Sequence, residues 1–470
     1  MMTRNLPLLA AAHRAYCADA DLRRRRTRYK HFTYGRQWDD TVTDSDGTVL
    51  TEGELASRSG RVPLTNNLIR QLVKTIVGRF RQSLTESASQ PQSETALRNQ
   101  LDELDSRLLE EFLISGCAIQ KLSHECRHGT TGWWIDNINP ARFFVDRRDD
   151  PRSTDIELAG VIHDMSQPEL LARFSEGDRA KAMQLRRLYG SRADSPFAAP
   201  AGTAAPEFFT ALPGRCRVIE TWTLDSREVL RCHDQASGDY YLAPASEAGR
   251  IEAANRRRHK SGKPGIASRW EISARWHCRH MAPDGTVIAE QPSAMADGGH
   301  PFVMKFYPLT DGEIHPFVED VIDQQKYVNR LITLIDNVMG TSAKGVLLFP
   351  EDQLSDGTSW ADIKAMWASY DGVIPYRPRP GHPEPHQVVT NSANTGAYEL
   401  LALEMKLFEE VSGVSGAIRG RESESGLTSA QLYDAQTRNA AIALADIFDS
   451  FDSFRRQRSS RLPCAGGSLI

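Results

Sequence analysis

The stretch FVEDVIDQQKYVNRLITLIDNVM, residues 317–339, is the most regular segment of the chain. Its apolar side chains recur at helical spacing, and no proline or glycine interrupts it before Gly340. It therefore predicts an amphipathic α-helix of roughly 35 Å, which needs a partner on its apolar face and water on the other. The apolar face consists of Val318, Val321, Ile322, Val328, Leu331, Ile332, Ile335, Val338 and Met339.

A small module is predicted directly after this helix. Residues 345–349 (GVLLF) and 372–376 (GVIPY) have the composition of short strands. A helix at 359–369 separates them, and Ser359 with Asp362 resembles a capping box at its start. The order predicts a β-α-β unit, followed by a proline-rich run.

Two more helices are predicted in the C-terminal third, at about 396–411 and 429–456. The loop between them, SGVSGAIRGRESESG at 412–426, is rich in glycine, serine and charge. Such a loop cannot bury enough apolar surface to offset its ordering entropy, so we expect it to be flexible.

The first two thirds of the chain mix both kinds of element, which indicates an α+β protein. Helical spacing covers residues 64–81, 95–114 and 166–190, and strand patterns cover 115–146, 216–224, 228–233 and 269–279. We interpret 191–214 as a loop and the polar stretch before 269 as a second, long loop.

The charge balance excludes a protein built mainly to grip nucleic acid through a basic surface. The 470 residues include 57 Lys and Arg and 61 Asp and Glu, for a formal net charge of −4. The only strongly basic segment is residues 1–36, with nine Lys or Arg against two Asp. A solvated helix face and an arm that touches nucleic acid are both compatible with this segment.

Other classes are also disfavoured. No run of 18 apolar residues is present, so we expect no membrane-spanning helix, and the N-terminus does not have the pattern of a signal peptide. The seven cysteines are scattered without a CxxC pair, which is typical of free thiols in a reducing compartment.

Two histidine-containing patterns can be compared with the requirements of a metal site. HECRH at 124–128 matches the HExxH pattern of zinc metalloproteases, which requires both histidines on one helix face, one turn apart. Strand-like GCAIQKLS precedes it and the turn GTTGWW follows it, so we predict a hairpin. WHCRH at 276–280 alternates like a strand. We therefore predict no metal site and no catalytic residue, and a zinc hydrolase built on HECRH remains an alternative.

Energy-converting chemistry is not expected either. The glycine-rich GVSGAIRG at 413–420 has no preceding strand and no GK[ST], so it lacks the parts of a Walker A loop.

Three parts of the sequence, in this order, carry a resemblance. They are YKHFTYGRQWDD (29–40) with RVPLTNNLIRQLVKTIVGRF (61–80), HPFVMKFYPLTDGEIHPFVEDVIDQQKYVNRLITLIDN (300–337), and FEEVSGVSGAIRGRESESGLTSAQL (408–432). Together they resemble the portal proteins of tailed bacteriophages, the head-tail connectors of virions and prophages.

The resemblance implies the fold of these portals, with an α+β wing, a helical stem, a small β-α-β clip, and a tunnel loop with its helix. Its implied divisions are a basic N-terminal arm (1–29), wing (30–314), first stem helix (315–340), clip (341–392), second stem helix (393–411), tunnel loop (412–426), crown-proximal helix (427–458) and C-terminal tail (459–470). Portal chains usually continue into a helical crown, whereas LPCAGGSLI ends this sequence. We expect a short or missing crown, either minimal or truncated.

The resemblance also implies function, partners and site residues. A ring, usually of twelve subunits, would sit at one capsid vertex and conduct double-stranded DNA during packaging and ejection. Terminase large subunit, head-tail adaptor, and capsid and scaffold proteins would be its partners, without cofactor or membrane, after assembly in the bacterial cytoplasm. A ring-forming virion protein without DNA passage is the second alternative. The implied site residues are Arg419, Arg421, Glu422 and Glu424 facing DNA, Trp360, Lys364 and Trp367 for terminase docking, and Val328, Leu331 and Ile335 for stem packing.

Overall fold

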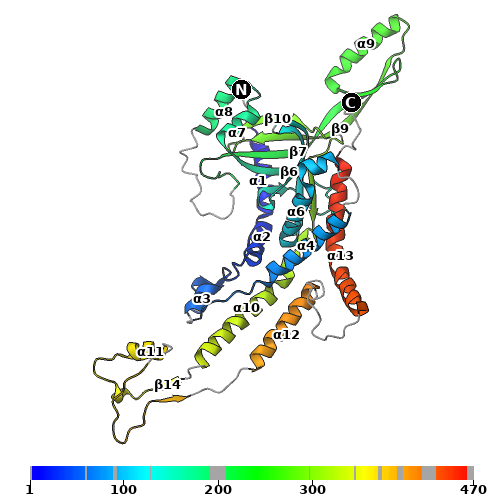
Figure 1. Cartoon of the computed structure of the whole chain (residues 1–470). Helices are drawn as coiled ribbons and strands as arrows, with labels where there is room; N and C mark the ends of the chain where they lie inside the picture. The colour runs from blue at the N-terminus through cyan, green and yellow to red at the C-terminus, as the bar shows by residue number, and fades with distance from the viewer. Residues whose placement is uncertain are drawn as a thin grey trace. The chain divides into compact units, whose positions relative to one another are not determined.

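The computed structural model describes residues 3–58, 61–87, 93–127, 129–190, 208–295, 297–342, 346–368, 373–388, 395–414 and 430–462. The chain is an α+β protein that divides into two compact units (Figure 1). Unit 1 comprises residues 1–27, 76–317 and 444–470, and unit 2 comprises 28–75 and 318–443. Residues 28–75 thus cluster with 318–443, whereas the resemblance implied a wing that runs from 30 to 314.

Two antiparallel sheets form the centre of unit 1. The larger has the strand order β10-β9-β7-β6-β5, with β8 paired to β7, and the smaller has the order β11-β3-β4. The bounds of the larger sheet are β5 Phe143–Val145, β6 Leu158–Met165, β7 Cys216–Asp234, β8 Tyr240–Pro244, β9 Ile266–Met281 and β10 Val287–Pro292. Those of the smaller are β3 Cys117–Arg127, β4 Thr130–Asn137 and β11 Phe302–Phe306.

Different elements pack on the two faces of the larger sheet. Helix α1 packs its buried side chains onto Ile219 and Met281 of one face. On the other face, Trp222 and Cys278 join an apolar cluster with β3 and β11, while Val218 joins a second cluster with α7 and α8. The helices concerned are α1 Leu6–Ala18, α7 Gln167–Phe174 and α8 Arg179–Gly190. The strip of sheet between these last two clusters is polar.

The basic N-terminal segment folds into α1 and α2 (Ala20–Thr33). Its charges are divided between the interior and the surface. Arg26 donates to both carboxylate oxygens of Glu111 at 2.6 and 2.8 Å, and its side chain is 8% exposed. Arg24, by contrast, has an 83% exposed side chain.

Three helices meet through aromatic side chains. Phe451 of α13 (Ala430–Arg461) lies 5.5 Å from Phe80 of α4 (Leu68–Ser87) and 5.7 Å from Phe112 of α6 (Leu101–Ser115), between ring centroids. The helix expected over 95–114 is two helices, α5 (Glu94–Asn99) and α6, because Gln100 adopts a left-handed backbone with φ of 49°.

The polar stretch before β9 contains a helix, so its prediction as a loop was wrong. Helix α9 (Ala248–Lys260) connects β8 to β9, and strands β7 and β9 continue past the rest of the sheet to reach it (Figure 1). The two strands expected over 216–233 are therefore one strand, β7.

Unit 2 contains α10 (Phe317–Ser342) and α12 (Thr395–Ser412), close to their predicted bounds. Its smaller elements are β1 Thr41–Thr43, β2 Val49–Thr51, α3 Glu52–Arg58, β14 Val346–Leu348, α11 Trp360–Ala368 and β15 His386–Val388. The short strands β12 (Leu309–Thr310) and β13 (Glu313–Ile314) precede α10.

The partner of β14 differs from the prediction. It is β15, and the expected strand at 372–376 contributes only an isolated bridge from Tyr376 to Leu354. Pro375 and the prolines after it cannot donate to a ladder, which explains the failure of the pattern there.

Candidate functional site

Two of the three sequence stretches that carry the resemblance, 29–40 with 61–80 and 300–337, contribute to one buried polar junction in unit 2. Gln37 comes from the first stretch, Asn66 and Asn67 precede α4, and Gln325 and Asn329 lie one turn apart on α10. Gln325 is 0% exposed, and Gln37 and Asn329 are each 2% exposed.

Gln325 lies at the centre of this junction. Its Oε1 accepts from the backbone N–H groups of Leu68 at 2.9 Å and Ile69 at 3.2 Å, which are the first residues of α4. Its Nε2 donates to the Asn66 carbonyl at 2.7 Å and to Asn329 Oδ1 at 3.1 Å. A side chain from α10 therefore satisfies donors that the start of a helix leaves free.

Asn329 and Gln37 extend the junction. Asn329 Nδ2 donates to Gln37 Oε1 at 2.6 Å, and Asn329 Oδ1 accepts from the Asn66 N–H at 3.0 Å. Gln37 Nε2 donates to Asn67 Oδ1 at 3.1 Å and to the Phe32 carbonyl at 2.7 Å. The network fixes the residues before α4 against α10.

This junction corrects the predicted start of α4. The apolar spacing begins at Leu64, but the helix begins at Leu68. The Leu64 N–H donates to Thr333 Oγ1 at 3.0 Å, so these residues bond to α10 instead of to a helical turn of their own. Gln325, Asn329 and Thr333 recur at spacing four on α10, and this polar stripe is the sequence signal that could have revealed the junction.

A charged cluster lies in the same unit. Lys326 of α10 contacts Glu52 at 2.5 Å and Asp40 at 3.1 Å, and Arg28 donates to Asp40 at 2.8 Å. Burial alone would raise the pKa of Asp40, but the hydrogen bonds from Arg28 and Lys326 hold it below its ordinary value.

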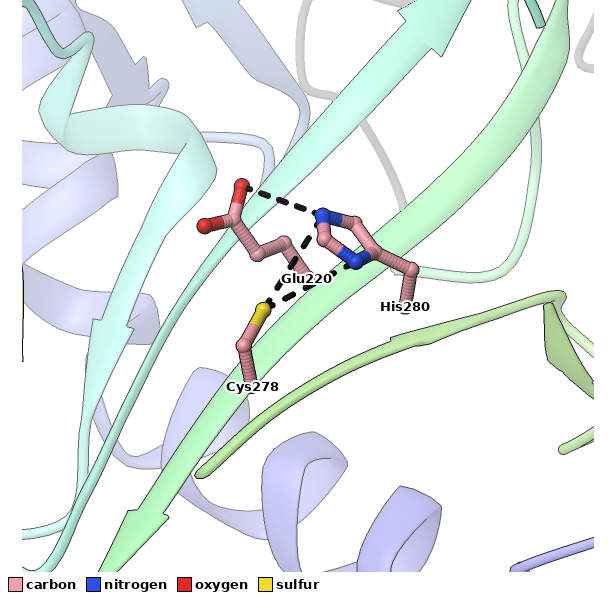
Figure 2. A group of neighbouring side chains, drawn as sticks. All are labelled: Glu220, Cys278 and His280. Atoms are coloured by element: carbon pink, nitrogen blue, oxygen red, sulfur yellow. Dashed lines mark hydrogen bonds and ion pairs between the residues drawn. The ribbon is translucent and has the colours of Figure 1, made fainter. Parts of the chain in front are cut away.

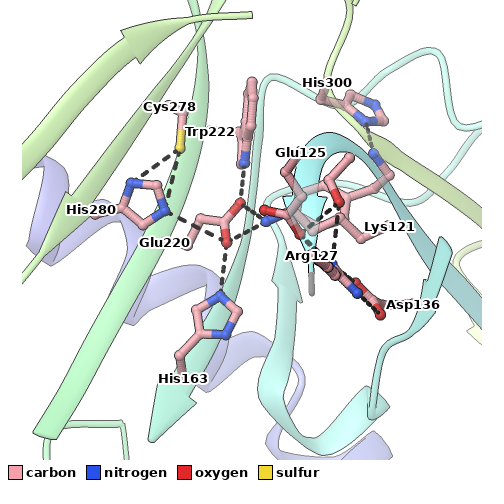
Figure 3. A network of polar contacts seen from close by, with 12 residues as sticks. Lys121, Glu125, Arg127, Asp136, His163, Glu220, Trp222, Cys278, His280 and His300 are labelled. Carbon is pink, nitrogen blue, oxygen red and sulfur yellow. Dashed lines mark hydrogen bonds and ion pairs between the residues drawn. The ribbon is translucent and has the colours of Figure 1, made fainter. Parts of the chain in front are cut away.

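A second polar network occupies the strip of the large sheet in unit 1 (Figure 3). Glu220 of β7 is 0% exposed, and its Oε1 accepts from Lys121 Nζ at 2.6 Å and from Trp222 Nε1 at 2.7 Å. Its Oε2 also accepts from Lys121 Nζ at 2.7 Å, and it lies 2.7 Å from His163 Nε2 and 3.8 Å from His280 Nε2.

Burial and charge shift the pKa values in this network in opposite directions. Burial would raise the pKa of Glu220, yet the Lys121 charge and the His163 hydrogen bond hold it well below its ordinary value. Burial lowers the pKa of His280 to about 4 and raises that of Cys278 well above its ordinary value.

HECRH is not a metalloprotease motif in this fold. Residues 117–127 form β3, which pairs with β4 as an antiparallel hairpin, as the sequence predicted. Glu125 accepts from Arg127 Nε at 2.5 Å, and Arg127 also pairs with Asp136 of β4 (Figure 3). The glutamate is thus held by an arginine, and the helix that the motif requires is absent from these described residues, while His128 lies outside them.

The expected site residues fall into three groups. Val328 and Leu331 are buried in unit 2 and Ile335 is half-buried. Trp360 and Lys364 of α11 are exposed, and the Trp360 ring lies edge-on to Phe349 at 5.9 Å. Trp367 is half-buried. The loop residues Arg419, Arg421, Glu422 and Glu424 lie outside the described residues.

Helix α12 exposes an apolar stripe. Leu400, Leu403, Leu407 and Val411 recur at spacings of three and four and are 37%, 51%, 39% and 46% exposed. Phe408 on the same helix is fully buried. Helix α12 therefore has one apolar face inside the chain and a second that faces outward.

Comparison with known proteins places the chain in a family. The profile of the phage P22-like portal proteins matches residues 134–462, which run from the middle of β4 to the end of α13. A search of curated proteins gives no match. Among the described residues no helix is long and apolar enough to cross a membrane. Because the family profile covers more than two thirds of its length, the chain belongs to the family of phage P22-like portal proteins.

Proposed function

We propose that this portal protein assembles into a dodecameric ring at one capsid vertex, where it conducts double-stranded DNA into the head and out again. Membership of the portal family carries the proposal, since this structural, non-enzymatic family implies a homo-oligomeric ring in the phage head. Terminase would dock during packaging, and a head-tail adaptor would follow it.

The apolar stripe on α12 supports ring formation. A stripe of four exposed apolar side chains is costly on a helix that meets only water, and such patches mark interaction sites. In a ring, each subunit makes the same heterologous contact with the next one. The stripe offers one side of such a contact, with the neighbouring copy of this chain as its partner.

The module of β14, α11 and β15 is our proposed docking surface for terminase and adaptor. It exposes Trp360 at 48% and Lys364 beside it on one short helix. Aromatic side chains are enriched where protein interfaces concentrate their binding energy, which supports this choice.

Electron microscopy of the purified protein tests the proposal. We expect closed rings with a central hole wide enough for duplex DNA. The double variant Leu403→Glu, Leu407→Glu should remain folded by circular dichroism but fail to form rings, because two charges would be buried at each contact.

The matched control is Ala402→Glu, which adds the same side chain at an exposed position beside the stripe on the same helix. It should assemble normally. A wild-type protein that stays monomeric under packaging-buffer conditions would refute the ring, and normal rings from the double variant would refute the role of the stripe.

We also propose that Arg419 and Arg421 meet DNA phosphates from the loop at 412–426. Both arginines belong to a glycine-rich, charged stretch between α12 and α13. In a ring they would form circles of isolated positive charge, which give weak, repeated phosphate contacts suited to a conduit.

The Arg419→Ala, Arg421→Ala variant should form rings and yet package or retain less DNA per particle. DNA content per purified particle is the measurement, and Arg456→Ala, at an exposed position of α13, is the control. Loss of rings in the loop variant, or DNA content equal to that of the control, would contradict this role.

A further inference from the structure

The polar strip of the large sheet brings together four side chains that ligate metals. Glu220 of β7 and His280 of β9 are direct cross-strand partners, Cys278 lies two residues from His280 on the same face, and His163 comes from β6. Figure 2 shows Glu220, Cys278 and His280 side by side. Glu220 and Cys278 are 0% exposed, and His280 is 5% exposed.

Three of the four ligand atoms lie slightly farther apart than around a tetrahedral ion, and the fourth, His163 Nε2, lies 2.7 Å from Glu220 Oε2. One atom each from Glu220, Cys278 and His280 lies within 4.8 Å of the others. Cys278 Sγ is 3.7 Å from His280 Nδ1 and 4.0 Å from Nε2, and Nε2 is 3.8 Å from Glu220 Oε2. A tetrahedral zinc ion with sulfur and nitrogen ligands has ligand–ligand separations of about 3.3 to 3.6 Å. Small side-chain movements would close these gaps.

The two oxygens of Glu220 share one partner and differ in the others. Lys121 Nζ donates to Oε1 at 2.6 Å and to Oε2 at 2.7 Å, Trp222 Nε1 donates to Oε1 at 2.7 Å, and Oε2 also faces the two histidines (Figure 3). An ion at Oε2 would replace the Lys121 bond to that oxygen, and Oε1 would keep its two donors. A carboxylate that ligates through one oxygen and is hydrogen-bonded through the other is the usual arrangement around a bound metal.

The hydrogen-bond contacts between Cys278 and His280 are long and weak. Within the described residues, the hydrogen-bond contacts found for the His280 ring are those to Cys278 sulfur at 3.7 and 4.0 Å. Thiols are weak hydrogen-bond partners, and buried polar groups normally find strong ones. The ring and the thiol face each other, and both lie within 4.8 Å of a carboxylate oxygen of Glu220, so one ion could satisfy all three.

We propose that Glu220, Cys278, His280 and His163 form a structural zinc site that joins β6, β7 and β9. A thiolate with imidazoles favours zinc over magnesium or calcium, and four protein ligands make a closed site without a position for substrate. On binding, the Cys278 thiol loses its proton to solvent, and both histidines ligate as neutral rings. The site is independent of the conduit function.

Lys121 is the group that opposes binding. Zinc, one thiolate and one carboxylate sum to zero charge, so the Lys121 ammonium leaves one net positive charge in a largely buried network; its side chain is 12% exposed. Lys121→Gln keeps a donor for Oε1 and removes this charge. It should therefore bind zinc more tightly, by roughly tenfold or more.

The experiment uses full-length protein made in zinc-supplemented medium and purified without chelator. We expect about one zinc per chain by elemental analysis, and cobalt(II) in its place should give a thiolate-to-cobalt absorption band. Cys278→Ser and His280→Gln should lose the metal, and Lys121→Gln should retain it against a chelator that strips the wild type.

Two controls separate the site from other cysteines and histidines. Cys216→Ser changes a buried cysteine outside the cluster on β7, the strand that carries Glu220, and His124→Ala tests HECRH. Both should keep the metal. Folded wild-type protein with no zinc and no cobalt–thiolate band would overturn the proposal, as would metal that survives Cys278→Ser, or weaker metal retention in Lys121→Gln.

Discussion

Replacing Arg458 by methionine is expected to destabilise the protein by about 3 kcal/mol, because the buried carboxylate of Asp105 loses its buried partner and keeps the more exposed Arg455 at 3.2 Å. Arg458 of α13 binds both carboxylate oxygens of Asp105 of α6, and its Nη1 also donates to Gln120 Oε1 at 3.1 Å. The two charged side chains are only 4% and 2% exposed. Urea unfolding, with the free energy taken from midpoint and slope, measures the change.

A double-mutant cycle shows whether the loss of stability comes from the Asp105 carboxylate that no longer pairs with Arg458. Arg458→Met together with Asp105→Leu should recover much of the stability, since an apolar pair of similar volume often replaces a buried ion pair at little cost. Arg456→Met, at an exposed position of the same helix, should change stability by less than about 0.5 kcal/mol. A similar loss in the single and double variants would show that packing around Arg458, not its charge, holds α13 to α6.

Elements with strong internal periodicity were predicted well from sequence. Helix α10 was expected over 317–339 and spans Phe317–Ser342, and α12 was expected over 396–411 and spans Thr395–Ser412. In both helices the apolar side chains repeat through several turns, so the pattern in the chain itself carries the information.

Helix α9 shows why other elements were missed. Eight residues of its sequence, AGRIEAANRRRHK, are polar or charged, and only Ile251 and Ala254 pack into the apolar cluster with β7, β8 and β9. Asn255 exchanges two hydrogen bonds with the backbone of Ile266, at 2.6 and 2.9 Å. These contacts come from a neighbouring strand, so no periodicity within the helix could reveal them.

The sequence pattern showed only some of the residues of each candidate site. The pattern WHCRH placed Cys278 and His280 on one side of a strand, but Glu220 and His163 reach them only through the pairing of β6, β7 and β9. The stripe of Gln325, Asn329 and Thr333 could be read along α10, whereas its partners lie more than 250 positions earlier in the chain. Long-range pairing of this kind requires the fold itself.

Gln325→Leu is expected to destabilise unit 2 by about 2 to 4 kcal/mol, because leucine fills a similar space but offers no hydrogen bond. The Ile69 N–H would lose its acceptor at the start of α4, and Asn329 would lose one of its donors. A buried polar group left without a partner costs roughly 1 to 3 kcal/mol. The free energy of unfolding in urea is again the measurement.

Comparison with two other variants identifies the cause. Gln71→Leu makes the same exchange at an exposed position of α4 and should change stability by less than about 0.5 kcal/mol. Gln325→Glu keeps the acceptor for Leu68 and Ile69 but loses the donor to Asn66. If the acceptor contributes most of the stability, the unfolding free energy of Gln325→Glu near neutral pH should lie between those of the wild type and Gln325→Leu. If Gln325→Leu unfolds at the same urea concentration as the wild type, the polar junction does not hold α4 to α10.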